Sequence, residues 1–273
     1  GLCAHGIGTG RVTREAKCEA VRAAPVYLVT EESLSAGRTT EAIVDAALEA
    51  KIGNYLRRVQ GAHGGWPLFQ DGAFDISASV KAYFALKAIG DDINAPHMVR
   101  ARESILAHGG AATSNVFTRL LLALWGEVPW RAVPVMPVEV MFLPKWFPFH
   151  LSKVSYWART VIAPLLVLQA LKPKARNPKG VGIDELFLQP PLTVGPKTKA
   201  PHQKWSWFLF FRGVDAILRL IEPHFPKGLR QRAIDKSVEF VTERLNGEDG
   251  LGAIFPPMVY VLIVFRALGY AED

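Results

Sequence analysis

The sequence predicts an all-α protein, folded as an α/α toroid of paired antiparallel helices joined by short turns. Apolar residues recur at helical spacing along most of the 273 residues, and strand-like alternation is scarce. Gly-rich breaks at 61–65, 109–110 and 247–252 separate the helices. In such a fold each helix pair buries its apolar face against the next pair. A hydrophobic fraction of 49% supports a substantial core and excludes a disordered chain.

Apolar residues at the spacing of one helix face mark the expected helices in chain order. They lie at Leu48, Ile52, Tyr55 and Val59, then at Val80, Tyr83 and Phe84, then at Val116, Phe117, Leu120, Leu121, Leu124 and Trp125, and last at Ile234, Val238, Val241 and Leu245.

Other elements follow from prolines, glycines and composition. A further helix is expected over 150–172, and Asp91-Asp92 is expected to close a helix after Gly90. Two prolines make the apolar stretch 133–143 an irregular connection rather than a strand. The stretch 173–201, rich in Pro, Lys and Gly, is predicted to be a loop. Residues 1–40 show weak periodicity and no clear helix caps, so they stay unassigned.

Cysteine and histidine spacing argues against a metal centre. Cys3 and Cys18 are the only cysteines, which excludes a disulfide framework and a zinc site rich in thiolates. The seven histidines never sit three or four residues apart, so we predict no metal site. No apolar run reaches the roughly 18 residues of a spanning helix. No signal peptide is visible, so we expect a protein on the cytoplasmic side.

The net charge of +7 is concentrated in one segment. Between Lys172 and Arg244 there are 14 basic and 7 acidic residues, so the rest of the chain holds 32 − 14 = 18 basic and 25 − 7 = 18 acidic residues. Such a surface attracts a polyanion, either nucleic acid or anionic lipid, unless it is simply solvated.

An aromatic stretch lies inside this basic segment. Residues 205–211 (WSWFLFF) are flanked by Lys204 and Arg212, a composition that fits a helix lying in a membrane interface. Burial against another part of the protein is the alternative. The expected membrane contacts are Trp205, Trp207, Phe208, Phe210 and Phe211. This stretch favours lipid over nucleic acid, and we expect no nucleic-acid partner.

A Gln and a Trp follow the first expected helix at a characteristic spacing. The string is Tyr55-Leu56-x3-Gln60-x5-Trp66. The Gln amide is long enough to bond free backbone groups at a helix end, and the Trp ring is large enough to cover a neighbouring helix. This string resembles the Gln-Trp repeat of the triterpene cyclases, squalene–hopene cyclases above all. Supporting blocks lie at 78–86, 116–122, 138–143, 155–160 and 247–257, so the resemblance covers roughly residues 44–270.

The resemblance implies an architecture and an activity. Squalene–hopene cyclases have two α/α barrels, one inserted into the sequence of the other, around a large apolar cavity. They bind a membrane face without crossing it and take squalene from it. A protonated Asp of an Asp-x-Asp-Asp motif starts the reaction, aromatic side chains stabilise the carbocations, and no metal or organic cofactor is used.

This chain departs from the family pattern in one respect. Asp-x-Asp-Asp occurs nowhere in the 273 residues. We therefore expect residues 41–273 to be the inserted barrel of the N-terminal half, with no catalytic residue of its own and no activity by itself, since an alkene needs a strong acid. The first residue is Gly, which suggests that sequence upstream is missing. Residues 1–40 do not look like the usual start of the family.

The resemblance also assigns residues to the substrate cavity. Trp157 matches an indole that lines it, where a desolvated cation over the ring gains ~2 kcal/mol or more. A core Trp on the expected helix is the competing interpretation. Ile254, Phe255 and Pro256 match a wall segment near the place where the final cation is quenched, and Tyr260 is a candidate hydroxyl there. Where some members carry an acid and an Arg, this chain has Lys81 and Asn115, which we interpret as a solvated Lys and a helix-capping Asn.

The predicted function is therefore hopanoid biosynthesis, as half of an isomerase that cyclises squalene once joined to the missing barrel. Expected partners are squalene or a similar linear triterpene, a membrane surface and the C-terminal barrel. A homodimer is a further possibility. The expected location is the cytoplasmic face of the bacterial inner membrane, as a monotopic protein. The alternative function is a non-catalytic α-toroid that binds a protein or lipid. A prenyltransferase β subunit shares the toroid, but the cysteine positions exclude its zinc site.

Overall fold

A computed structural model describes residues 46–175, 177, 179–196, 204–245, 251–252 and 254–270. The chain divides into two compact units. The first unit is Gly1–Ser114 with Arg176–Leu188, and the second unit is Asn115–Ala175 with Gln189–Asp273. The expected boundary at residue 40 stays a prediction, because residues 1–45 lie outside the described part of the chain.

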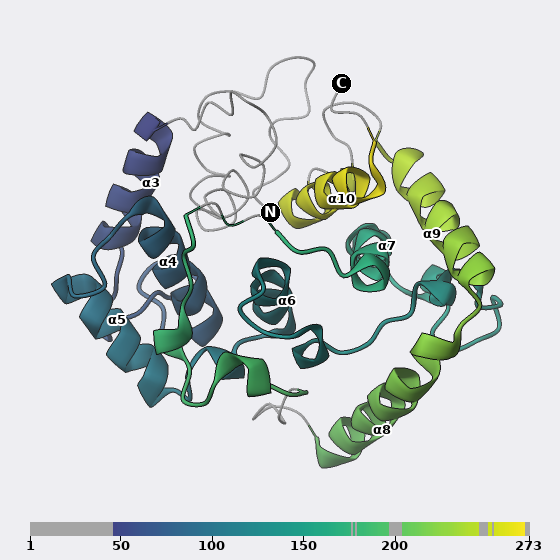
Figure 1. Ribbon diagram of the computed structural model, residues 1–273, viewed down its shortest axis with the longest axis horizontal. Helices are drawn as coiled ribbons and strands as arrows, with labels where there is room; N and C mark the ends of the chain where they lie inside the picture. The colour runs from purple at the N-terminus through teal and green to yellow at the C-terminus, as the bar shows by residue number, and fades with distance from the viewer. Residues whose placement is uncertain are drawn as a thin grey trace. The chain divides into compact units, whose positions relative to one another are not determined.

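The all-α class is confirmed, since the described residues form helices and turns without a strand (Figure 1). The α-helices are α3 (Ala46–Arg58), α4 (Ile76–Ile89), α5 (Pro96–Ala107), α6 (Val116–Trp125), α7 (Tyr156–Leu171), α8 (Trp205–Ile221), α9 (Lys227–Thr242) and α10 (Phe255–Leu268). Short 3-10 turns are η1 (Ala111–Thr113), η2 (Trp130–Ala132), η3 (Val138–Phe142), η4 (Leu151–Lys153), η5 (Asp184–Leu186), η6 (Pro191–Thr193) and η7 (Glu222–His224). No helix among these has the length and apolar content needed to cross a bilayer.

The first unit is built around α4, which packs against α3 and α5. The Asp75 carboxylate accepts a hydrogen bond from Ala78 N at the start of α4. Gly90 ends the helix, as predicted, at a φ of 117° that only glycine adopts without strain. Val80, Tyr83 and Phe84, the predicted apolar face, are fully buried.

The returning segment of the first unit is held to α4 by polar contacts. Tyr83 Oη donates to Glu185 Oε1 at 2.9 Å, and Lys87 Nζ donates to Glu185 Oε1 and to Gly182 O, both at 2.6 Å. Burial, together with the Glu185 carboxylate, raises the pKa of the Tyr83 phenol well above its usual value. The predicted loop over 173–201 is thus irregular in its described part but anchored at defined points.

The core of the second unit lies where α7 packs against α9 and α10 (Figure 1). Ala163, Val241, Leu251 and Val261 form its centre. Helix α7 begins at Tyr156 rather than at the expected residue 150, because residues 151–153 form a separate 3-10 turn. The Pro-bounded stretch 133–143 is irregular apart from the short turn η3, as predicted.

Candidate functional site

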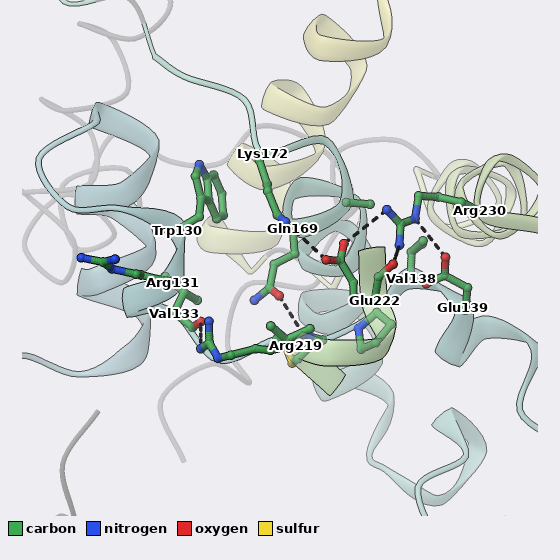
Figure 2. A pocket seen from close by; sticks show the side chains of 14 residues that line it. Trp130, Arg131, Val133, Val138, Glu139, Gln169, Lys172, Arg219, Glu222 and Arg230 are labelled. Atoms are coloured by element: carbon green, nitrogen blue, oxygen red, sulfur yellow. Dashed lines mark hydrogen bonds and ion pairs between the residues drawn. The ribbon is translucent and has the colours of Figure 1, made fainter. Parts of the chain in front are cut away.

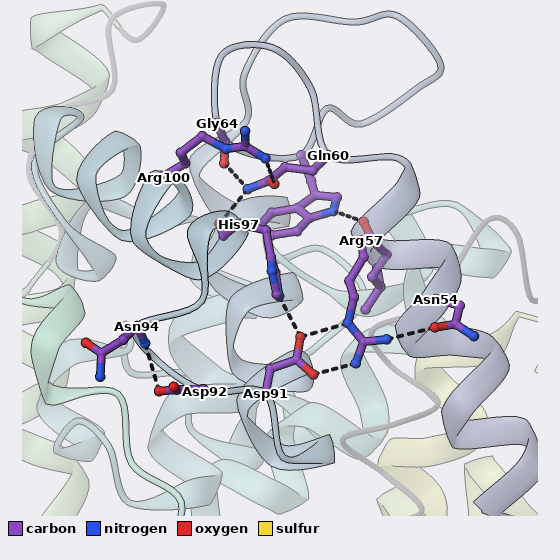
Figure 3. Close-up of polar contacts among 11 residues, drawn as sticks. Asn54, Arg57, Gln60, Gly64, Asp91, Asp92, Asn94, His97 and Arg100 are labelled. Carbon is purple, nitrogen blue, oxygen red and sulfur yellow. Dashed lines mark hydrogen bonds and ion pairs between the residues drawn. The ribbon is translucent and has the colours of Figure 1, made fainter.

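The Gln-Trp string forms a tight junction after α3 in the first unit (Figure 3). Gln60 Nε2 donates to Gly64 O at 2.6 Å and to His97 O, in the first turn of α5, at 2.8 Å. Trp66 is buried, and its Nε1 donates to Leu56 O at 2.9 Å. The indole therefore satisfies a free carbonyl in the last turn of α3. The Gln60 amide links the loop that follows α3 to the first turn of α5.

Glycine is required at the centre of this junction. A side chain at Gly65 would overlap the Phe74 ring and the Ser79 hydroxyl. That hydroxyl accepts a hydrogen bond from Trp66 N at 2.8 Å. The close approach of backbone to helix α4 thus explains why Gly precedes Trp here.

The substitution Gln60→Met is expected to destabilise the first unit by about 1–2 kcal/mol. It keeps the side-chain length but removes the two hydrogen bonds that Gln60 donates and the one that its Oε1 accepts from Arg100 Nη2 at 3.2 Å. Amide hydrogen exchange in α3 and α5 measures the loss as faster opening. Gln231→Met is the control and should change stability by less than about 0.5 kcal/mol. The Gln231 side chain is exposed, and within the described part of the chain it bonds only to Asp235, one turn along the same helix. Equal effects of the two substitutions would contradict the proposed link.

A polar cluster that the sequence did not reveal lies beside this junction. Asp91 receives two hydrogen bonds from the Arg57 guanidinium, one of them from Nε at 2.9 Å, and His97 Nε2 lies 2.6 Å from Asp91 Oδ2 (Figure 3). Burial by itself raises the pKa of the Asp91 carboxyl, but the hydrogen bonds from Arg57 and His97 outweigh it, so the pKa lies below its usual value. The cluster links three elements of the first unit: α3, the turn that follows α4, and α5.

The second unit holds a cavity of about 250 Å³ with a charged lining (Figure 2). Arg230 lies between two carboxylates, with Nε 3.0 Å from Glu139 Oε1 and Nη1 3.3 Å from Glu222 Oε1. Lys172 Nζ lies 3.6 Å from Glu222 Oε2. Apolar side chains, among them Val133, Met136 and Val138, also line the cavity, so its wall combines ion pairs with apolar surface.

The polar groups around this cavity support the irregular Pro-containing stretch. Gln169 accepts from Met136 N at 2.8 Å and donates to Pro134 O at 2.9 Å. Backbone groups outside helices need such partners when they are buried. Gln169 therefore has a structural role at this cavity. None of the expected substrate-cavity residues is among the residues that line it.

The expected substrate-cavity residues lie on α7 and α10, which pack against each other. Trp157, in the first turn of α7, is 61% exposed, so within the described chain it is not the core Trp of the competing interpretation. Ile254 and Pro256 are half-buried, and Tyr260 is buried with 4% exposure. The backbone of Phe255 begins α10, but its side chain lies outside the described part.

Helix α8 has no buried residue and presents a continuous apolar face. Of the expected membrane contacts, Trp205, Trp207, Phe210 and Phe211 are exposed and Phe208 is half-buried. The exposed apolar side chains extend beyond the predicted stretch to the end of the helix, through Leu209, Ile217, Leu220 and Ile221. Their helical spacing places most of them on one face.

The opposite face of α8 carries the residues that hold it on the second unit. Asp215 Oδ1 accepts from Val135 N at 2.8 Å, and Arg219 donates from Nη2 to Val133 O at 2.9 Å. Asp215 and Arg219 also pair with each other at 2.7 Å, one helical turn apart. A charged pair one turn apart in a mostly apolar helix is the sequence signal for the attached face.

The prediction that Lys81 is solvated is wrong, whereas the prediction that Asn115 caps a helix is confirmed. Lys81 is half-buried on α4, and burial, partly offset by Asp75, lowers the pKa of its ammonium. Lys81 lies on α4, which packs against both α3 and α5. The residues around Lys81 in the sequence do not indicate this packing. The Asn115 side chain accepts from Thr118 N at 2.8 Å at the start of α6.

The described residues hold no group of three or more His, Cys, Asp or Glu side chains placed to bind a metal ion.

Comparison with known proteins assigns a family. The family described as "Squalene-hopene cyclase N-terminal domain" matches residues 28–273. The chain is 68% identical over 230 residues to a squalene–hopene cyclase of Bradyrhizobium diazoefficiens, an alignment that covers 84% of the chain and 35% of that protein. It is 56% identical over 229 residues to the enzyme of that name from Zymomonas mobilis (84% and 34%) and 32% identical over 229 residues to that of Alicyclobacillus acidocaldarius (84% and 36%). The chain thus spans about a third of the length of these relatives.

Proposed function

Because this chain belongs to the squalene–hopene cyclase N-terminal domain family, we propose that it forms one helical wall of a triterpene cyclase. The observation that carries the proposal is the similarity to squalene–hopene cyclases along 84% of the chain. The substrate is squalene or a similar linear triterpene, and the product class is the hopanoids. The chain contains no Asp-x-Asp-Asp string, so the proton that starts cyclisation comes from the C-terminal barrel when the two are joined.

The chain contributes Trp157 to the reaction chamber in this proposal. Its exposed indole, at the start of α7, is available to face a substrate held by the complete enzyme. An indole face stabilises a desolvated cation by ~2 kcal/mol or more. The half-buried Ile254 and Pro256 at the start of α10, with Phe255, form a second part of the wall, and the buried Tyr260 supports it from behind.

The chain also docks the enzyme on a membrane in this proposal, through the apolar face of α8. The basic surplus in the segment around α8 favours an anionic lipid surface. The location is then the cytoplasmic face of a bacterial inner membrane, as a monotopic protein. A helix with aromatic rings on one face and cationic flanks binds in the interface without crossing the bilayer.

The test of the cyclase function is ligand binding and activity. An ammonium analogue of squalene is expected to raise the thermal unfolding midpoint of the chain, whereas a neutral hydrocarbon of the same length should raise it less. Joined to a barrel with the Asp-x-Asp-Asp motif, the chain is expected to convert squalene, and by itself it is expected to be inactive. Absence of a thermal shift together with an inactive joined protein would favour the alternative of a non-catalytic scaffold.

A further inference from the structure

A second exposed aromatic cluster lies in the second unit, between η3 and α7. Its residues 145–153 (KWFPFHLSK), here called the aromatic turn, include Trp146, which is 76% exposed, and Phe149, which is 53% exposed. Trp146 is more exposed than Trp205, the most exposed ring of α8 at 65%. A cluster of large exposed rings is typical of an interaction surface, whereas a single exposed apolar residue is not.

The aromatic turn has a defined conformation. Its backbone makes consecutive turn hydrogen bonds, from Phe147 N to Pro144 O at 2.9 Å, from His150 N to Phe147 O at 3.1 Å and from Lys153 N to His150 O at 2.9 Å. The rings form a chain of edge contacts, with centroids 5.8 Å apart for Trp146 and Phe147 and 6.0 Å apart for Phe147 and Phe149. Rings fixed before binding lose little conformational entropy when they bind.

The aromatic turn is flanked by basic residues. Lys145 and Lys153 are exposed at its two ends, and Lys153 Nζ also donates to Trp146 O at 3.1 Å. No acidic residue occurs in the sequence between Glu139 and Asp184. Lysine is depleted in the cores of protein interfaces, whereas Trp with nearby Lys is typical of a membrane interface, where the Lys stem lies along the acyl chains and the ammonium meets anionic headgroups.

We propose that the aromatic turn is a second membrane contact, separate from α8, which places Trp146 and Phe149 at the headgroup level of an anionic bilayer. This inference rests on the proposed membrane docking of the chain. Two separated contacts fix the orientation of a monotopic protein on the membrane plane, which a single helix does not do.

The test is binding of the chain to vesicles of phosphatidylcholine with phosphatidylglycerol. The double substitution Trp146→Ser and Phe149→Ser is expected to weaken binding about tenfold or more. The control is Leu68→Ser with Phe69→Ser, an apolar pair in the first unit that is 72% and 71% exposed, lies beside Asp71 and lacks basic flanks. It should leave binding unchanged. Unaltered circular dichroism of each variant shows that the fold is kept.

A second measurement locates the ring directly. Lipids brominated near the headgroup should quench the tryptophan emission of the unsubstituted chain more than that of Trp146→Phe. Unchanged vesicle affinity of the Ser variant and equal quenching would overturn the inference, while loss of binding on substitution in α8 would still support the docking proposal. Failure of the unsubstituted chain to bind any vesicle would instead overturn the docking proposal, and the inference with it.

Discussion

The double substitution Leu209→Glu and Leu220→Glu is expected to lower the affinity of the chain for anionic vesicles by more than about a hundredfold. Both side chains project from the exposed apolar face of α8, at 59% and 72% exposure, and no buried contact is lost when they change. Each leucine withdrawn from the bilayer forfeits about 1.5–3 kcal/mol, and the two together exceed the roughly 2.7 kcal/mol of a hundredfold change. The added carboxylates are further repelled by anionic lipid.

Co-sedimentation with vesicles measures this loss. Leu68→Glu is the control, because Leu68 is also 72% exposed but belongs to the first unit and has no Lys or Arg near it in the sequence, between residues 59 and 80. Retained binding of the double variant would show that α8 does not enter the lipid. If the double variant instead gained solubility without a change in lipid binding, the face of α8 would be a protein interface covered by another part of the enzyme.

Replacement of Asp91 by Asn is expected to cost about 2–3 kcal/mol of stability in the first unit. The Asp91 side chain is buried and accepts hydrogen bonds from the Arg57 guanidinium and from His97, and hydrogen bonds to charged groups contribute about 1.5–3 kcal/mol each. The gain from the ion pair is reduced because Arg57 is partly exposed to water. Amide exchange in α3, α4 and α5 at neutral pH measures the loss.

The effect of Asp91→Asn has a defined pH dependence. The pKa of Asp91 is lower in the folded chain than in the unfolded chain, so its contribution is complete above the ordinary Asp pKa of about 3.9 and is lost as the pH falls through the folded value. The difference in stability between the original chain and the variant should therefore shrink as the pH falls below about 4. A difference that stays the same into strong acid would contradict the role of the carboxylate. Asp92→Asn is the control, since among the described residues the Asp92 carboxylate accepts a hydrogen bond only from Asn94 N, in an exposed turn.

The sequence predicts the start of α8 better than its later part and its attachment to the second unit. The aromatic residues of 205–211 are exposed on α8, as expected for four of the five predicted contacts, whereas their contact with a membrane stays a prediction. The continuation of its apolar face to Ile221, and the attachment through Asp215 and Arg219, became evident only from the structure. The bonds to Val135 and Val133 join residues 80 and 86 positions apart, and sequence spacing carries no information on such pairs.

The amino-acid sequence by itself determined the all-α class, the end of α4 at Gly90, the cap of α6 at Asn115 and the family resemblance, because helical periodicity, capping and motif spacing are local properties of the chain. Only the tertiary structure decided which charges meet, as in the pairing of Arg57 with Asp91 from 34 residues away. It also decided that Trp157 is open and Tyr260 buried. Burial and ion pairing depend on distances between helices, and these distances are fixed by packing of whole faces rather than by the residues on any one of them.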